Sequence, residues 1–205
     1  MIQLYGHAKT RSLRASWALE EVSAEYQFID VDLHSGAGRR EPFISLNPAG
    51  KVPVLVDDGL VLTESAAIVT YLGDKFPQSK LVPAAGSVDR ARYNQWCYFV
   101  LTELEQPLWT MAKHRFALPE ARRVPAILDC ASWEFARAIK LLEKRLTGLF
   151  ALGDQFSAAD ILLGHTLQWA QAFQLETGSA LLDEYLQRLA VSPALAKAMA
   201  RESAT

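Results

Sequence analysis

The N-terminal part of the chain combines the hydrophobic patterns of strands and helices. Residues 2–5 form a short apolar run, and the apolar positions over residues 13–19 recur with a helical period. Residues 26–33 then alternate apolar with polar side chains, as a half-buried strand does. The pattern predicts a strand–helix–strand unit at the start of the chain.

A hairpin and a further helix are predicted next. The expected elements are a short helical piece, a turn, two strands and a helix, over residues 40–46, 47–50, 52–56, 60–62 and 63–76. The sequence Asp57-Asp58-Gly59 supplies the positive-φ glycine of a tight turn, so the two strands are expected to be antiparallel. Pro77 ends the helix because it lacks the N–H that would continue it.

The remainder of the chain shows only helical periodicity. Pro, Ala, Ser and Gly are frequent in residues 77–86, which is typical of a linker. The segments with helical periodicity are residues 87–113, 119–146, 157–172 and 179–189, and the Ala-rich stretch 193–205 is expected to fray at its end. The predicted fold class is α/β plus all-α, with an α/β domain over residues 1–78, a linker over 79–86 and a helical-bundle domain over 87–205.

Composition excludes several classes of function. The chain has 205 residues, of which 50% are hydrophobic and 21% charged, as in an ordinary globular protein. The 21 Lys and Arg residues nearly balance the 23 Asp and Glu residues, so nucleic acid and membrane partners bound through bulk charge are not expected. The N-terminus lacks a basic stretch followed by an apolar core, and no apolar run approaches the length of a membrane span. These features favour a cytoplasmic location.

Two motifs in the N-terminal part and one in the helical part carry a family resemblance. Residues 47–55 read Asn-Pro-Ala-Gly-Lys-Val-Pro-Val-Leu, and residues 63–72 read Thr-Glu-Ser-Ala-Ala-Ile-Val-Thr-Tyr-Leu. Residues 152–161 read Leu-Gly-Asp-Gln-Phe-Ser-Ala-Ala-Asp-Ile. Together they resemble the cytosolic glutathione transferases, and the similarity covers almost the whole chain. The resemblance implies a thioredoxin-like N-terminal domain, an all-α C-terminal domain and a homodimer.

Glutathione is an anionic tripeptide, so its site needs donors for two carboxylates and an acid for its ammonium group. Ser65 stands at the start of a predicted helix, where its hydroxyl and free main-chain N–H groups suit the γ-glutamyl carboxylate. Glu64 would then meet the ammonium group. A hydroxyl here also suits a helix cap, through Thr63 or Ser65, and the two roles are compatible.

The resemblance places two further parts of glutathione. It implies a cis bond before Pro53, which leaves the main chain of Val52 to pair with the cysteinyl part of the ligand. Without the resemblance, Pro53 would be interpreted as a proline at the start of a strand. Arg39, Arg40 and Lys51 lie in or beside loops at the expected ligand edge and are candidates for the glycyl carboxylate, with solvated surface charge as the alternative for each.

A hydroxyl in the first loop is expected to activate the thiol of glutathione. In the serine-type branch of the family, the activating serine lies four residues before an arginine of the first helix, and counting back from Arg14 gives Thr10. Threonine keeps the hydroxyl donor but adds a methyl group, so the chain departs from the family pattern here. Ser12 is the alternative donor, with an N-cap role equally open. Tyr5, a possible counterpart of the tyrosine-type branch, lies within the first apolar strand and is expected in the core.

The helical domain is expected to hold a hydrophobic electrophile. The resemblance places the helix predicted over residues 87–113 along the electrophile pocket. Trp109 on this helix and His114 at its end are the candidate residues. Aromatic residues at such positions are more often core than pocket. Ser157 and Asp160 form a capping box, for which a role in folding is expected.

The predicted function is that of a glutathione transferase, in a serine-type bacterial or theta/phi-like branch, that conjugates the glutathione thiolate to a hydrophobic electrophile. Both cysteines, Cys97 and Cys130, fall in the helical part, without Cys-x-x-Cys or metal-ligand spacing, so the reactive sulfur is expected to come with the ligand. Glutathione is then a co-substrate, and no metal or other cofactor is expected. Two alternatives remain open: a glutathione-binding sensor or docking module without turnover, and a glutathione-dependent peroxide or disulfide reductase.

Overall fold

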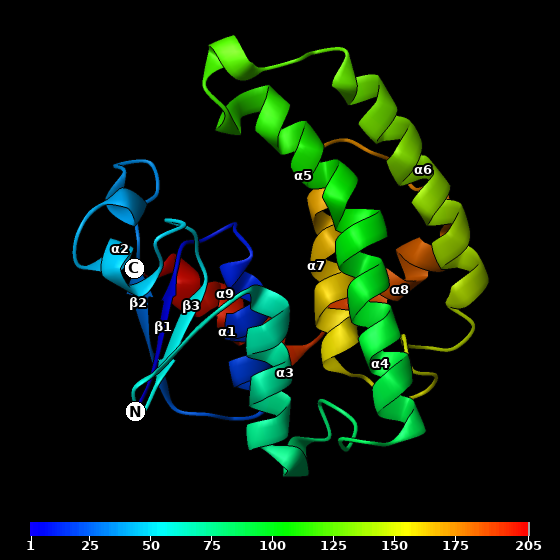
Figure 1. The fold of residues 1–205 in the computed structure, drawn as a ribbon. Helices are drawn as coiled ribbons and strands as arrows, with labels where there is room; N and C mark the ends of the chain where they lie inside the picture. Colours follow the sequence, from blue (N-terminus) through cyan, green and yellow to red (C-terminus); the bar gives the residue numbers. More distant parts are fainter. Residues whose placement is uncertain (205) are drawn as a thin grey trace. The chain divides into compact units, whose positions relative to one another are not determined.

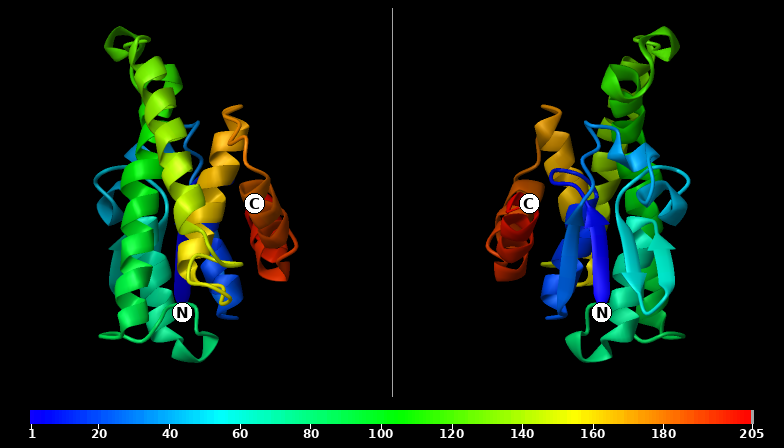
Figure 2. Two further views of the ribbon diagram at one scale, coloured as in Figure 1. Left: turned by 90° about the vertical axis from the view of Figure 1, so that its right-hand side faces the viewer. Right: turned by 90° about the vertical axis from the view of Figure 1, so that its left-hand side faces the viewer.

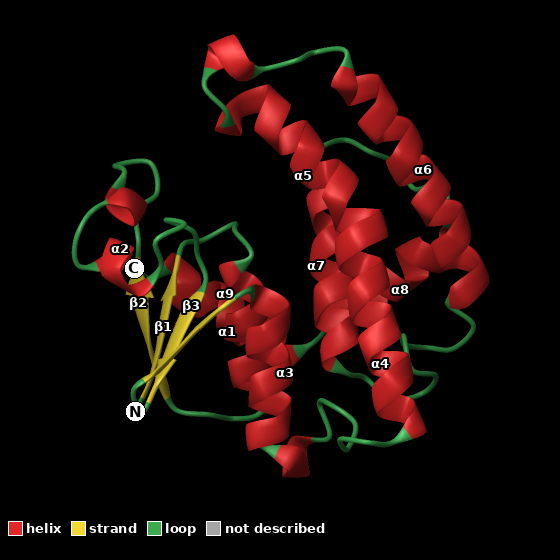
Figure 3. Cartoon of the chain, viewed as in Figure 1, coloured by secondary structure: helices red, strands yellow, loops and turns green. Residues whose placement is uncertain are grey.

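The computed structural model describes residues 1–204, which form two compact units. The first unit contains Met1–Ala84 together with the segment that begins at Leu189, and the second contains Ala85–Arg188. Strands occur in the first unit, whereas the second is helical apart from an isolated bridge between Phe150 and Gly153 (Figure 3). None of the helices in the described part of the chain is long and apolar enough to cross a bilayer.

A four-stranded sheet forms the centre of the first unit (Figure 1). Its strands are β1 (Ile2–Gly6), β2 (Tyr26–Asp30), β3 (Val54–Asp57) and β4 (Leu60–Thr63). They lie in the order β2-β1-β3-β4; β1 and β2 are parallel, and β3 is antiparallel to both β1 and β4. The predicted strand–helix–strand start and the predicted hairpin are therefore confirmed.

Helices cover both faces of this sheet because its strands are apolar on both sides. The helices of the first unit are α1 (Ser12–Glu21), α2 (Phe43–Leu46), α3 (Ser65–Lys75) and α9 (Pro193–Ser203), with short 3-10 turns at Ala37–Arg39 and Pro77–Ser79. Phe43 of α2 packs with Val54 on one face, and Tyr5 lies half-buried against Phe43 with the ring centroids 6.1 Å apart. Leu4 and Leu55, the next residues along their strands, are fully buried on the other face.

Helix α9 packs against α1 and belongs to the first unit (Figures 1 and 2). The Ser16 hydroxyl donates to Glu202 Oε1 at 2.6 Å, and Arg201 Nε donates to Glu20 Oε1 at 3.0 Å. The prediction that assigned this stretch to the helical domain is thus wrong: Pro193–Ser203 is a helix of the first unit. Its contacts join residues far apart in the sequence, which hydrophobic periodicity does not reveal.

The second unit is the predicted helical bundle. Its α-helices are α4 (Val88–Phe99), α5 (Gln106–Ala112), α6 (Ile127–Arg145), α7 (Ala158–Ala172) and α8 (Ala180–Ala190). Two π-helical segments, Val100–Glu105 and Lys113–Ala117, make α4 and α5 one continuous helical run, while Glu120–Arg122 forms a 3-10 turn before α6. Tyr93 and Met111, two of the aromatic and sulfur-containing residues along this run, are fully buried.

A buried carboxylate holds the start of α7. Asp160 accepts hydrogen bonds from the main-chain N–H groups of Ala151 and Ser157, at 2.7 and 2.8 Å, and from the hydroxyls of Ser157 and Tyr185, each at 2.9 Å. The predicted capping box is present, and Asp160 also ties the preceding loop and α8 to α7. Burial raises the pKa of Asp160, although all four hydrogen bonds favour the ionised form.

Replacing Asp160 with alanine is expected to destabilise the chain by roughly 2–6 kcal/mol, because two buried main-chain N–H groups lose their acceptor. Denaturant unfolding measures this change in the free energy of unfolding. Asp154→Ala, at an exposed position six residues earlier, is the control and should stay within about 0.5 kcal/mol of the parent. Equal stabilities for the two variants would contradict the role given to Asp160.

The buried carboxyl of Glu202 is expected to make stability depend on pH. Burial is the largest cause that raises its pKa from 4.5 to about 7; the Ser16 hydroxyl and His7 act in the opposite direction, and Asp30 adds to the rise. Since the folded pKa exceeds the unfolded value, the stabilisation by Glu202 is complete below about pH 4.5 and is lost as the pH rises through about 7.

Thermal or urea unfolding of the parent and of Glu202→Gln tests this dependence. Between pH 4.5 and 7 the parent should lose up to roughly 3 kcal/mol relative to the glutamine variant. Glu25→Gln changes an exposed carboxyl of the same unit and should give a curve parallel to the parent. A constant difference between the parent and Glu202→Gln across this range would overturn the assignment.

Candidate functional site

One end of the sheet gathers most of the residues that the sequence singles out. Because β1 and β2 are parallel and β3 runs opposite to β1 and β4, the C-terminal ends of β1, β2 and β4 lie beside the N-terminal end of β3. The register pairs Tyr5 with Val54, and Val54 with Thr63, at this end. The loop after β1, the Val52–Pro53 segment and the start of α3 therefore converge at one edge of the first unit.

The start of α3 lacks a side-chain cap. Glu64 occupies the N-cap position with φ of 66° and ψ of 111°, and no side chain caps the helix. The cap expected from Thr63 or Ser65 is therefore wrong. A left-handed φ at a residue other than glycine is costly and often marks a functional site. The first N–H groups of the helix consequently face the sheet edge without a side-chain acceptor, as an anion site requires.

A buried arginine lies behind Ser65. Arg14 of α1 is fully buried, and its Nη1 donates to Ser65 Oγ at 3.2 Å. Since Arg14 uses an acceptor position of this hydroxyl, the hydroxyl proton can be donated to an anion. The buried positive charge adds to the positive end of the α3 dipole. Ser65 itself is 6% exposed, so its donor lies at the bottom of the anion site.

The turn before β3 is held by Asn47, which sequence analysis did not single out. Its side-chain Nδ2 donates to the carbonyl of Lys51 at 2.7 Å, and its Oδ1 accepts from the N–H of Ala49 at 3.1 Å. Its own carbonyl accepts from the N–H of Gly50 at 2.8 Å. The turn leads into the Val52–Pro53 bond, which is cis, as the resemblance implies.

Two glycines bring the candidate cationic residues together. A Cβ on Gly38 would stand 2.8 Å from the carbonyl oxygen of Gly50, and a Cβ on Gly50 would stand 2.8 Å from that of Gly38. This close approach of two loops needs glycine on both sides and places Arg39 beside the turn that carries Lys51. Arg40 instead donates to the carbonyl and the hydroxyl of Ser35, at 3.0 and 3.2 Å, and stiffens its own loop.

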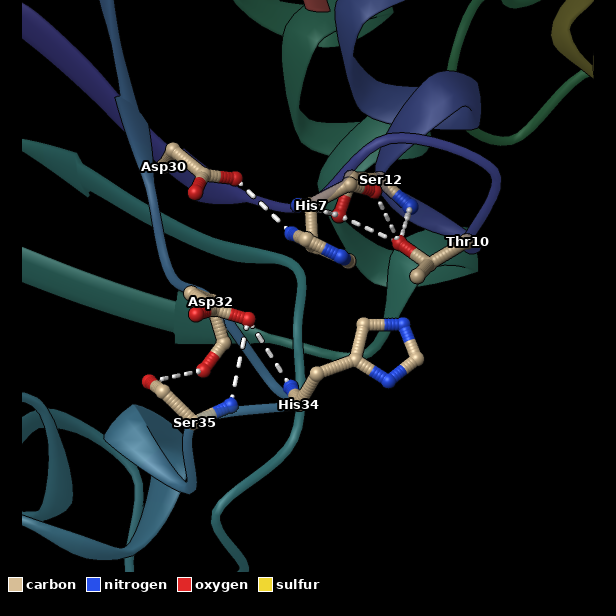
Figure 4. A network of polar contacts seen from close by, with 7 residues as sticks. All are labelled: His7, Thr10, Ser12, Asp30, Asp32, His34 and Ser35. Carbon is tan, nitrogen blue, oxygen red and sulfur yellow. Dashed lines mark hydrogen bonds and ion pairs between the residues drawn. The ribbon is translucent and has the colours of Figure 1, made fainter. Parts of the chain in front are cut away.

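Thr10 and Ser12 form one hydrogen-bonded group in the loop after β1 (Figure 4). Their hydroxyl oxygens lie 2.9 Å apart, Thr10 Oγ1 donates to the carbonyl of His7 at 2.6 Å, and the N–H of Ser12 donates to Thr10 Oγ1 at 3.2 Å. The N–H of His7 donates to Ser12 Oγ at 3.1 Å. Ser12 is fully buried whereas Thr10 is partly exposed, so only the Thr10 hydroxyl lies where a ligand can reach it.

The N-cap role left open for Ser12 is wrong. Arg11 is the N-cap residue of α1, and Ser12 is the first residue of the helix. The Ser12 hydroxyl is engaged instead with the main chain of His7 and with Thr10. It can therefore influence a ligand only through Thr10.

The other two candidate residues lie in the helical unit. Trp109 is a half-buried residue of α5, and His114 is a half-buried residue of the π-helical segment that follows. Nδ1 of His114 accepts a hydrogen bond from the N–H of Val124 at 3.0 Å, so this imidazole helps to hold the connection toward α6.

An aromatic group near the end of this helical run was missed in the sequence. Phe173, just after α7, makes edge-on contacts with Phe116 and Trp169, with ring centroids 6.3 and 5.7 Å apart. The guanidinium of Arg115 lies 4.9 Å from the centre of the Phe173 ring. Phe116 remains 61% exposed, so this group presents aromatic surface at the outside of the helical unit. No sequence signal connects residues 116 and 173, because they meet only through the packing of two helices.

Both cysteines belong to the helical unit. Both are free, Cys97 in α4 and Cys130 in α6. Burial raises the pKa of Cys97 to about 11, which disfavours its thiolate. Among residues 1–204, no three His, Cys, Asp or Glu side chains are grouped so that they could hold a metal ion.

The sequence and the fold were compared with those of known proteins. Residues 1–74 match the family model "Glutathione S-transferase, N-terminal domain", and residues 134–200 match "Glutathione S-transferase, C-terminal domain". A zeta-class glutathione S-transferase of Euphorbia esula is 31% identical over 166 residues, which are 79% of this chain and 72% of that protein.

Two solved structures share the fold of the whole chain. The crystal structure of a glutathione transferase from Methylococcus capsulatus superposes with a TM-score of 0.88 at 30% identity and covers 100% of both chains. The transferase URE2P6 of Phanerochaete chrysosporium, solved with oxidized glutathione, has a TM-score of 0.86 at 25% identity and covers 99% of this chain and 96% of its own.

Proposed function

The chain belongs to the glutathione S-transferase family and is a glutathione transferase, and we propose how its residues bind glutathione and activate the thiol. The proposal rests on one observation: an anion site at the start of α3 and a partly exposed threonine hydroxyl lie at the same edge of the sheet. Glutathione is an anion whose thiol must lose a proton before it can react. In this proposal the start of α3 binds the anionic group, and the Thr10 hydroxyl stabilises the thiolate.

The γ-glutamyl end of glutathione binds at the start of α3 in this proposal. Its carboxylate accepts hydrogen bonds from the Ser65 hydroxyl and from main-chain N–H groups of the helix, above the buried charge of Arg14. The exposed carboxylate of Glu64 pairs with the ammonium group. This arrangement matches charge at both ends of the γ-glutamyl residue and fixes its orientation.

The rest of the tripeptide follows the sheet edge toward the two-glycine contact. The main chain of Val52 pairs with the cysteinyl residue, next to Pro53. The glycyl carboxylate meets Arg39 and Lys51, both exposed cations beside the Gly38–Gly50 contact. Arg40 supports the binding of glutathione indirectly, because its hydrogen bond to the carbonyl of Ser35 stiffens the loop that carries Arg39.

The sulfur of glutathione lies at Thr10. Because Thr10 donates its one hydroxyl proton to the carbonyl of His7, the Ser12 hydroxyl is the donor in the bond between the two hydroxyls. A bound thiolate draws the Thr10 proton away from the carbonyl, while the bond from Ser12 is kept. The result is a chain of donors from the His7 N–H through Ser12 and Thr10 to the sulfur. Each hydrogen bond in such a chain polarises the next, and together they favour the thiolate.

The thiolate then attacks a hydrophobic electrophile, and the leaving group departs with the electron pair of the broken bond. Trp109 and His114 of the helical unit contact this electrophile in the proposal, together with the aromatic group of Phe116, Trp169 and Phe173. Glutathione is the co-substrate and no further cofactor takes part. We further propose a homodimer located in the cytoplasm, both of which are usual for the family.

Ser65→Ala is expected to weaken glutathione binding by roughly 10–100-fold, because a hydrogen bond to a charged group contributes about 1.5–3 kcal/mol. Isothermal titration calorimetry measures the dissociation constant. Ser87→Ala is a matched control, since Ser87 caps α4 by accepting from the N–H of Arg90 and its loss should lower stability alone. Similar affinities for the two variants would contradict the anion site.

Thr10→Val should raise the pKa of the bound glutathione thiol by roughly 1–2 units, because it removes the hydroxyl donor and keeps the shape of the side chain. Ultraviolet absorbance of the bound thiolate, titrated against pH, reports this change. Turnover of an aryl halide at neutral pH should fall by about 10–100-fold. Thr10→Ser retains the donor and is expected to keep the parent pKa; equal pKa values in the valine and serine variants would exclude Thr10 as the donor.

A further inference from the structure

His7 is the first residue of the loop that carries the hydroxyls of Thr10 and Ser12, to which the thiol activation is assigned. It follows β1 directly, and both of its main-chain polar groups are engaged inside the loop. The N–H holds Ser12 Oγ at 3.1 Å, and the carbonyl accepts from Thr10 Oγ1 at 2.6 Å. Any rotation of the His7 main chain therefore changes the position of both hydroxyls.

The side chain of His7 connects the start of this loop to the neighbouring strand β2. Its Nδ1 lies 2.9 Å from Oδ1 of Asp30, the last residue of β2, and the side chains are 21% and 32% exposed. A carboxylate only accepts hydrogen bonds, so Nδ1 is the donor. A second hydrogen bond joins the ends of β1 and β2 here: the N–H of Val31 donates to the carbonyl of Gly6 at 2.7 Å.

Polar groups from several elements lie near the imidazole or interact with it electrostatically. Figure 4 shows the His7 ring between Asp30 and Thr10, with His34 on the side of Thr10. The ring of His34 meets that of His7 edge-on, with centroids 5.6 Å apart. Asp32 follows β2, and Glu202 of α9 interacts electrostatically with His7. Asp30 is the group that bonds the ring directly, so it determines the orientation of the imidazole.

We propose that His7, anchored by Asp30, is a positioning residue for thiol activation. The anchor holds the main chain of residue 7 so that its N–H starts the donor chain and its carbonyl aligns the Thr10 hydroxyl before glutathione binds. This inference rests on the proposed role of Thr10. It adds a side-chain pair outside the glutathione contacts on which the acidity of the bound thiol depends.

The anchor has a definite consequence for kinetics. The anion site at Ser65 and the turn at Lys51 use other elements of the sheet edge, so loss of the anchor leaves the affinity for glutathione unchanged. The hydrogen bonds from His7 through Ser12 to Thr10 become less well ordered, so they stabilise the thiolate less and the pKa of the bound thiol rises. The rate constant of turnover therefore falls while the Michaelis constant for glutathione is retained.

Three variants test the proposal. His7→Ala removes the anchor; His7→Asn keeps a neutral donor near the position of Nδ1; His34→Ala removes the neighbouring imidazole and serves as the control. The measurements are the ultraviolet titration of the bound thiolate, and kcat and KM with an aryl halide. Circular dichroism confirms that each variant is folded.

In His7→Ala, the pKa of the bound thiol should rise by about one unit and kcat at neutral pH should fall about tenfold, with KM for glutathione within about twofold of the parent. His7→Asn should recover most of the parent values, and His34→Ala should match the parent. An unchanged thiol pKa in His7→Ala would overturn the proposal. So would an asparagine variant as impaired as the alanine variant, because the imidazole itself, as a proton acceptor, would then be the acting group.

The Thr10→Val variant distinguishes the proposed role of Thr10 from the proposed role of His7. If Thr10→Val raises the thiol pKa and His7→Ala does not, the role of Thr10 stands and the anchor alone is refuted. If Thr10→Val leaves the thiol pKa unchanged, the donor assignment fails and the role of His7 fails with it.

Discussion

The hydrogen bond from Arg14 to Ser65 is the contact on which the proposed glutathione site depends. It joins α1 to α3 through a guanidinium that is fully buried, where a charge is costly unless polar partners surround it. That cost is offset because the charge lies beneath the start of α3, where an anion is to bind. Removing either partner would disturb both the packing of the two helices and the donor that faces the ligand, so stability and binding are coupled at this point.

The same helix α1 also links the anion site to the thiol site. Arg14 and Ser12 lie in its first turn, two residues apart, so the helix that supplies the buried charge also begins with the hydroxyl behind Thr10. The distance between the γ-glutamyl carboxylate and the sulfur of glutathione is fixed by its covalent structure. The start of α1 carries Arg14, which lies behind the carboxylate subsite, and Ser12, which lies behind the thiol subsite. Because both lie on one rigid helix, the distance between the two subsites is fixed before the ligand binds, and such preorganisation lowers the entropy lost on binding.

Local patterns predicted much of this molecule, and contacts between distant residues account for what they missed. The hairpin, the helical bundle and the capping box at Ser157 follow from short-range periodicity and turn chemistry, and the motif resemblance led to Ser65 and Thr10. The position of α9 on α1 and the pairing of His7 with Asp30 depend on tertiary packing instead. The hydrogen bond from Asn47 to Lys51 is local, and it depends on the detailed geometry of its turn. Capping was misjudged at Ser12 and at Ser65 because a hydroxyl near a helix start can bind other partners. The Ser12 hydroxyl bonds within the preceding loop, and the Ser65 hydroxyl accepts from Arg14 of another helix.

Threonine at the position proposed for thiol activation has a physical rationale in this loop. The β-branched side chain of threonine has fewer rotamers than serine, so its hydroxyl direction is more restricted. Here the N–H of Ser12 and the carbonyl of His7 bind Thr10 Oγ1 from two sides and select one of those rotamers. The methyl group then restricts the rotation of a side chain whose hydroxyl oxygen these two bonds already hold in place. In the proposed mechanism the reactive sulfur comes with the ligand, so the orientation of the Thr10 hydroxyl would govern how readily that sulfur ionises.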